Sequence, residues 1–128
     1  MRADGLWHPR LLSVIAAAGH GDLVVVADPG LPVPVGVEVV DLVWRRGEPR
    51  LLPVLDAVLG ELVVERAEVA VELRDPELRQ GLVDLLGEPL ATVSHDDLER
   101  LTGTARVVVR TGEVTPYANV VLHAGVPF

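Results

Sequence analysis

The segment from Leu23 to Ala27 constrains the fold of this chain more than any other. It reads Leu-Val-Val-Val-Ala, without the alternation of polar and apolar side chains that a half-exposed strand shows. A continuous apolar run of this length is typical of a strand buried on both faces, and such strands occur in sheets that helices cover on both sides. The segment therefore predicts an α/β domain.

The rest of the chain alternates Val-rich runs with segments rich in Leu, Ala, Glu and Arg, which is the pattern of strands alternating with helices. Six strands are expected, over Leu23–Ala27, Val37–Val43, Val63–Leu73, Pro89–Val93, Ala105–Arg110 and Ala118–His123. Four helices are expected, over Pro9–Ala18, over Leu51–Leu62, over Pro76–Leu86 with Asp75 as its cap, and after the cap Ser94. No repeat or linker interrupts them, so residues 1–128 are predicted to form one domain, a central sheet of about six strands flanked by helices.

Composition excludes several classes of function. The net charge of −8 argues against nucleic-acid binding, which needs basic residues to displace the counterions of phosphate. The chain has no cysteine, which removes disulfides, thiolate metal sites and thiol chemistry, and no lysine, which removes Schiff-base chemistry. No apolar run approaches the roughly 18 residues of a membrane span, and no signal peptide is evident. A soluble cytoplasmic protein is predicted.

Polar side chains that could carry chemistry gather where strands and helices begin or end. His20 lies between two glycines just before the first strand, and Asp28 ends that strand and faces a loop with three prolines. His95 is placed at the start of a helix, where backbone N–H groups point outward. Tyr117 and Asn119 lie two residues apart, and so on one side of an extended segment. These residues are the candidates for a site.

Each candidate also fits a purely structural role. His20 could be a surface histidine in a turn, and Asp28 could cap its loop through an Asx turn. Asp22 could orient His20 or merely be solvated, and His8 and His123 are assigned no function. Two histidines and two aspartates could in principle hold a metal, but no pair has the fixed spacing of a metal motif, so no metal site is predicted.

Two longer motifs contain all of the site candidates except His95. Gly19–Asp22 followed by Val24–Pro34 lies near one end of the chain, and Val109–Leu122 lies near the other, with the ending Ala124–Phe128 after it. In both motifs the chain resembles the D-ribose pyranase family, which belongs to a group that also contains L-fucose mutarotases. The resemblance covers nearly the whole chain and is weakest from Val35 to Thr92.

The resemblance implies a role for each candidate. The family's catalytic histidine, a proton donor, falls on His20, and its sugar-binding aspartate falls on Asp28. Its second binding histidine falls on His95, and its binding triplet on Tyr117-Ala118-Asn119. Pro29 departs from the family, where many members carry Ala, and makes the loop stiffer. The absence of lysine means that any lysine contact in relatives is replaced or lost here.

The activity that the resemblance implies is the interconversion of the β-pyranose and β-furanose forms of D-ribose. The ring opens when its oxygen gains a proton and the anomeric hydroxyl loses one. Histidine titrates near neutrality and can supply that proton, which is worth about 10²–10⁴-fold in rate. Nothing is oxidised and no group leaves, so no cofactor is expected.

Two alternatives stay open. One is an L-fucose-type mutarotase that interconverts anomers, and the other is a non-catalytic sugar-binding partner of a sugar transporter. The presence of both His20 and His95 favours catalysis, and the segments Asp28–Pro32 and Pro116–Asn119 look like the ribose members' versions. The apolar content predicts a homo-oligomer larger than a dimer, and the resemblance implies a ring-based decamer with pockets near the subunit contacts.

Overall fold

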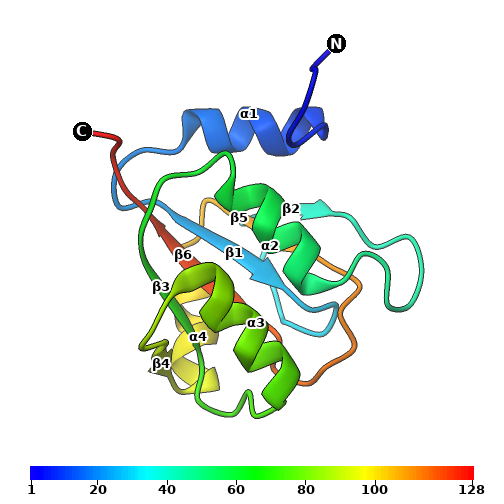
Figure 1. Ribbon diagram of the computed structural model, residues 1–128, viewed down its shortest axis with the longest axis vertical. Helices are drawn as coiled ribbons and strands as arrows, with labels where there is room; N and C mark the ends of the chain where they lie inside the picture. The colour runs from blue at the N-terminus through cyan, green and yellow to red at the C-terminus, as the bar shows by residue number, and fades with distance from the viewer.

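The computed structural model describes residues 1–128 as one six-stranded sheet with four helices around it (Figure 1). In chain order the elements are α1 (Pro9–Ala17), β1 (Leu23–Ala27), β2 (Glu38–Asp41), α2 (Leu51–Leu59), β3 (Val64–Ala70), α3 (Pro76–Leu86), β4 (Ala91–Val93), α4 (His95–Thr102), β5 (Val107–Arg110) and β6 (Val120–Ala124). The predicted α/β class, the six strands and the four helices are confirmed. None of these helices is both long and apolar enough to cross a membrane.

The strand order in the sheet is β2-β5-β1-β6-β3-β4. β1 is parallel to β5 and antiparallel to β6, β2 is parallel to β5, and β3 is parallel to β4 and antiparallel to β6. All strands except β6 therefore run in one direction. We call the edge at which these five strands end the carboxyl edge, and the opposite one the amino edge.

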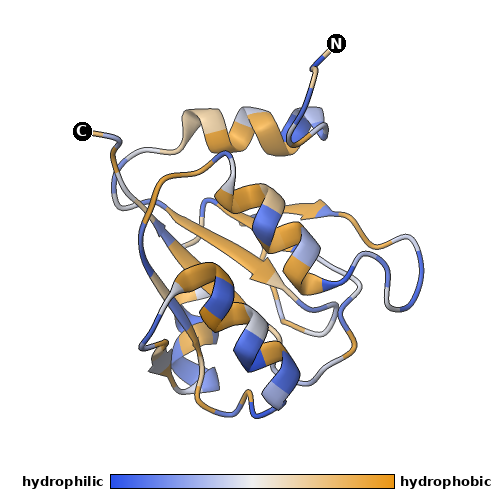
Figure 2. Ribbon diagram, viewed as in Figure 1, coloured by the Kyte–Doolittle hydropathy of each residue, from blue (hydrophilic) through white to orange (hydrophobic).

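Helices cover both faces of the sheet, as the apolar run of β1 predicts. Val24 and Val26 belong to a core cluster with residues of α1, α2 and α3, whereas Leu23, Val25 and Ala27 pack in a second cluster with residues of α4. All five residues of β1 are buried, and Figure 2 shows the strand as hydrophobic along its length. The domain thus has three layers, with β1 in the middle one.

The caps expected from the sequence start the helices. The side chain of Asp75 accepts a hydrogen bond from the N–H of Leu78, and that of Ser94 from the N–H of Asp97. His8 caps α1 in the same way through its Nδ1 atom. Helix α2 is shorter than expected and ends at Leu59, because the apolar spacing also counted Leu62, a core residue that lies in the turn after the helix.

The loop after β5 is hydrogen-bonded to residues 47–51, which lead into α2. Gly112 lies flat against residues 47–49: its N–H donates to the carbonyl oxygen of Pro49 at 2.7 Å, and its carbonyl oxygen accepts from the N–H of Gly47 at 2.9 Å. The buried side chain of Glu113 accepts from the N–H of Leu51 at 3.0 Å and from the hydroxyl of Thr115 at 3.0 Å. These contacts fasten the start of α2 to the loop that leads to β6.

Glu113 is expected to make stability depend on pH. Burial raises the pKa of Glu113, but the hydrogen bonds from Leu51 and Thr115 outweigh burial and hold that pKa below its ordinary value. The carboxylate therefore stabilises the fold above the pKa that Glu113 has in the unfolded chain, and this contribution is lost as pH falls through the lower folded pKa. Glu113→Gln should lower the free energy of unfolding by about 1–3 kcal/mol at neutral pH.

Urea unfolding of both proteins at neutral pH and at about pH 3 measures this effect. The difference between wild type and Glu113→Gln should shrink on acidification, because the wild-type carboxylate is then increasingly protonated. A difference that stays constant over this range would contradict the assignment.

Candidate functional site

The carboxyl edge brings together the predicted sugar-binding residues. Asp28 directly follows β1 and Asn119 directly precedes β6, and these two strands are paired, with Val26 opposite Val120. His95 follows β4, and Tyr117 lies in the loop between β5 and β6. In α/β sheets ligands bind outside the carboxyl ends of the strands, so this is the edge where a site is expected.

Asn119 holds Asp28 in a fixed orientation. The N–H of Asp28 donates to Asn119 Oδ1 at 2.9 Å, and Asn119 Nδ2 donates to Asp28 Oδ2 at 3.5 Å. Asp28 Oδ1 accepts from the N–H of Gly30 at 2.9 Å, which is the Asx turn considered from the sequence. Asn119 is only 1% exposed. The aspartate that the resemblance assigns to the sugar is therefore preorganised by its own backbone and by a buried amide.

His95 is restrained from three directions. Both carboxylate oxygens of Glu72, which follows β3, accept from the N–H of His95 at 3.1 Å. The Nε2 atom of His95 lies 2.9 Å from Glu99 Oε1, one turn further along α4. The ring of Tyr117 packs against the imidazole edge-to-face, with 5.0 Å between ring centroids and 74° between ring planes. The loop after β3, helix α4 and the loop after β5 thus meet at this histidine.

The backbone at Tyr117 differs from the expected extended segment. Tyr117 has φ 60°, a left-handed conformation, and its carbonyl oxygen accepts from the N–H of Asn119 at 3.0 Å. This turn puts the two side chains in different surroundings, with Tyr117 41% exposed and Asn119 buried. The prediction that they share one side of a strand is wrong. Ala118 is fully buried and packs in the core, and its assignment to sugar binding stays a prediction.

His20 lies at the amino edge, away from the other candidates. It precedes β1, and the N–H of the next residue, Gly21, donates to the carbonyl oxygen of Ala124 at the end of β6. Strand β1 lies between His20 and Asp28, and at a rise of about 3.3 Å per residue its five residues span about 16 Å. His20 and the other candidates were expected to form one site, and the structure corrects this for a single chain: His20 lies at the opposite edge of the sheet.

Glu65, not Asp22, is the carboxylate that contacts His20. His20 Nε2 lies 3.0 Å from Glu65 Oε2, and the His20 side chain is 61% exposed. Asp22 instead accepts from the N–H of Gly19 at 2.8 Å and from Arg106 at 3.0 Å. Only the pairing of β3 with β6 brings Glu65 beside His20, so no local pattern in the sequence could have identified it.

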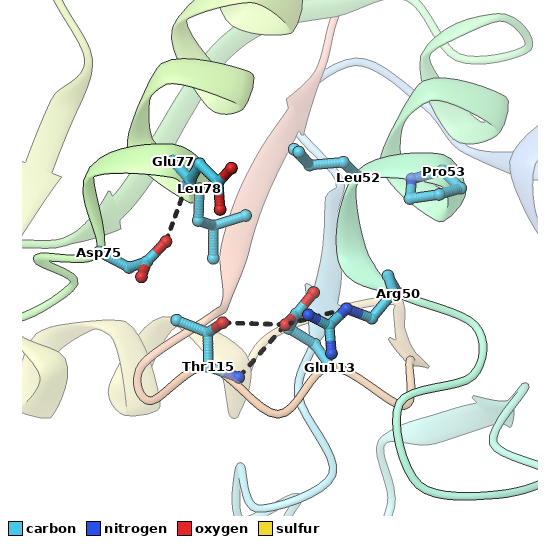
Figure 3. A pocket seen from close by; sticks show the side chains of 8 residues that line it. All are labelled: Arg50, Leu52, Pro53, Asp75, Glu77, Leu78, Glu113 and Thr115. Atoms are coloured by element: carbon cyan, nitrogen blue, oxygen red, sulfur yellow. Dashed lines mark hydrogen bonds and ion pairs between the residues drawn. The ribbon is translucent and has the colours of Figure 1, made fainter.

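Polar residues outside the candidate site also lie close together in two places. His123 Nε2 lies 3.0 Å from the buried carboxylate of Glu68, which Arg66 also contacts at 2.8 Å. A cavity of about 300 Å³ opens between α2, α3 and the loop after β5, but it is lined by none of the five candidates of the carboxyl edge (Figure 3). In Figure 3, Glu113 reaches Thr115 and Arg50 at one side of this cavity. No group of three or more His, Asp or Glu side chains is close enough to hold a metal ion.

Known proteins resemble this chain over its whole length. It is 49% identical to the D-ribose pyranase of Symbiobacterium thermophilum and 47% identical to that of Variovorax paradoxus, with all of both chains covered in each comparison. The structure of Bacillus subtilis RbsD complexed with D-ribose matches all of the chain with a TM-score of 0.94 at 38% identity. The structure of FucU from Bifidobacterium longum covers 95% of this chain and 97% of its own, with a TM-score of 0.82 at 23% identity, and so shares the fold.

The resemblance inferred from the two terminal motifs is confirmed by a match that also includes the middle of the chain. The sequence model of the RbsD / FucU transport protein family matches residues 1–127. The chain belongs to the RbsD / FucU transport protein family.

Proposed function

We propose that this protein is an isomerase that interconverts the β-pyranose and β-furanose forms of D-ribose. The observation that carries the proposal is a sequence comparison. The chain is 49% identical to a protein named D-ribose pyranase, and the alignment covers the full length of both. The Bacillus subtilis relative, 38% identical, is described in complex with D-ribose. The carboxyl edge of this chain offers the chemistry that a neutral sugar needs: a fixed carboxylate, an imidazole and an exposed aromatic ring.

The reaction needs two proton transfers and positioned hydroxyl groups. Asp28, held by Asn119, accepts hydrogen bonds from sugar hydroxyls, and the exposed ring of Tyr117 lies beside the same site. His20 delivers a proton to the ring oxygen as C1–O5 breaks, while the anomeric hydroxyl gives its proton to water and C1=O forms. Closure from a different hydroxyl gives the furanose. All atoms stay in the sugar, so the step requires no cofactor.

His20 reaches the sugar from a second copy of the chain. Within one chain it is separated from Asp28 by the length of β1, and no hinge lies within the paired strands. The amino edge of one copy must therefore meet the carboxyl edge of the next. Such head-to-tail contacts use two different surfaces and close into rings when the rotation permits. This supports the predicted homo-oligomer, for which the family resemblance implies ten copies.

Light scattering at micromolar concentration measures this assembly. We expect a particle several times heavier than the 13.7 kDa chain. If the decamer that the family resemblance implies is formed, the particle contains ten chains. A stable monomer that still accelerates the exchange of ribose forms would contradict the shared site.

Saturation-transfer NMR on D-ribose tests the proposed reaction. The protein should increase the exchange between β-pyranose and β-furanose signals above the uncatalysed rate, and it should act more slowly on the anomers of L-fucose. L-Fucose carries an additional methyl-bearing carbon, to which a loop stiffened by Pro29, Pro32 and Pro34 adapts little. Discrimination by one such group is worth about 1–3 kcal/mol, or roughly 10–200-fold. An equal or faster rate on L-fucose would favour the mutarotase alternative.

The description of the family as transport proteins favours a second candidate, a sugar-binding partner of a transporter. The same carboxyl edge would then bind ribose without converting it. Calorimetric binding of ribose together with an exchange rate equal to that of the buffer would support this candidate and exclude the isomerase.

A further inference from the structure

Glu99 lies beside His95 and has no role in the reaction proposed above. It is one turn after His95 on α4, its side chain is 39% exposed, and its Oε1 atom lies 2.9 Å from His95 Nε2. The His95 side chain is 21% exposed and packs against the ring of Tyr117, while Glu72 holds the backbone N–H of His95. An accessible carboxylate thus faces an accessible edge of a fixed imidazole.

The surroundings of the ring decide which nitrogen carries the proton. The Nδ1 atom of His95 is buried and has no hydrogen-bond partner in the chain. A proton placed there would be a buried donor without an acceptor, which is costly. The Nε2 atom faces the carboxylate of Glu99, which only accepts. The neutral ring therefore carries its proton on Nε2, and His95 and Glu99 form a donor and an acceptor side by side.

A sugar hydroxyl is the group that matches such a pair. A hydroxyl both accepts and donates one hydrogen bond, so one hydroxyl that enters between the two groups can replace their direct 2.9 Å contact, accepting from His95 Nε2–H and donating to Glu99. Hydrogen bonds to an ionised acceptor are about twice as strong as neutral ones. We infer that Glu99 is a specificity-determining residue that, together with His95, binds one hydroxyl group of the sugar. This inference rests on the proposed function of the carboxyl edge.

The inference is distinct from the role of Asp28. Asp28 uses one oxygen for its own loop and is held by Asn119, whereas the carboxylate of Glu99 accepts from no backbone N–H and has its one polar contact with His95. The two carboxylates belong to different elements, the loop after β1 and helix α4. The inference therefore assigns the two carboxylates to different hydroxyls of the sugar.

Calorimetric binding of D-ribose and of its 1-deoxy, 2-deoxy, 3-deoxy and 4-deoxy analogues, by wild type and Glu99→Gln, tests the inference. Glu99→Gln keeps the shape of the side chain but removes its charge, and it should weaken ribose binding about ten-fold or more. One analogue, the one lacking the contacted hydroxyl, should bind wild type and variant with nearly equal affinity. Asp96→Asn is the matched control, because Asp96 is an exposed carboxylate on the same helix, and it should leave all affinities unchanged.

Each result has a definite meaning. If Glu99→Gln weakens ribose and every analogue by the same factor, or weakens none, Glu99 does not bind a hydroxyl and the inference is wrong. If wild type itself binds no ribose, the proposed function fails instead. Circular dichroism of the variant checks the fold, which a substitution at this partly exposed position should not disturb.

Discussion

His20→Ala should reduce the catalysed exchange between the ribose forms by about 10²–10⁴-fold, since one positioned proton-transfer group contributes an effect of this size. The variant should fold normally, because the His20 side chain is 61% exposed and its one polar contact is with Glu65. Exchange rates from saturation-transfer NMR, with circular dichroism as the check of the fold, measure the effect. Retention of more than about a tenth of the activity would move the acid role to His95.

Mixing two inactive variants tests whether His20 acts across a subunit contact. The partner variant combines His95→Ala with Tyr117→Ala, which damages the carboxyl edge and leaves the amino edge intact. When the two variants are unfolded and refolded together in equal amounts, about a quarter of the head-to-tail contacts should pair an intact His20 with an intact carboxyl edge. Activity should return to about that fraction. Two variants that remain inactive after mixing, although light scattering shows mixed assemblies, would place His20 and the sugar in one chain.

The sequence predicted the fold well because its strongest signals are local. The apolar run of β1 needs burial on both faces, and the caps Asp75 and Ser94 start their helices through hydrogen bonds to residues three positions away. Such interactions depend only on neighbouring residues. Errors arose at element ends, as at Leu62, where a core residue continues the apolar spacing of a helix that has already ended.

The site was less predictable because its geometry depends on long-range pairing. Glu65 reaches His20 only through the register of β3 with β6, and Glu72 and Glu99 converge on His95 from two elements. His20 and Asp28 lie at opposite edges of the sheet because they flank the two ends of β1. The sequence of one chain does not show how a second chain is placed against either edge. The family resemblance predicted the candidate residues, all but His95 within the two motifs, and their arrangement required the structure.

A methyl group at Gly112 should destabilise the protein more than any surface substitution. A Cβ atom there would lie 2.6 Å from the backbone nitrogen of Glu48, 2.7 Å from its carbonyl oxygen and 2.8 Å from its carbonyl carbon. These are backbone atoms, so no side chain can rotate away to make room. The loop from residue 45 to residue 50 must move instead, and with it the contact of Glu113 with the first N–H of α2.

Gly112→Ala should therefore lower the free energy of unfolding by about 3 kcal/mol, at the upper end of the usual cost of overpacking. It should also weaken ribose binding, because Gly112 itself lies in the loop after β5 that continues through Glu113 to Tyr117. Gly60→Ala is the control: Gly60 ends α2 with an ordinary φ of −69°, a Cβ there would meet its nearest atom at 3.5 Å, and the substitution should leave stability equal or slightly higher. Urea unfolding of the three proteins measures these differences. If Gly112→Ala unfolds at the same urea concentration as Gly60→Ala, the loop yields easily to the added methyl group and does not lock the carboxyl edge.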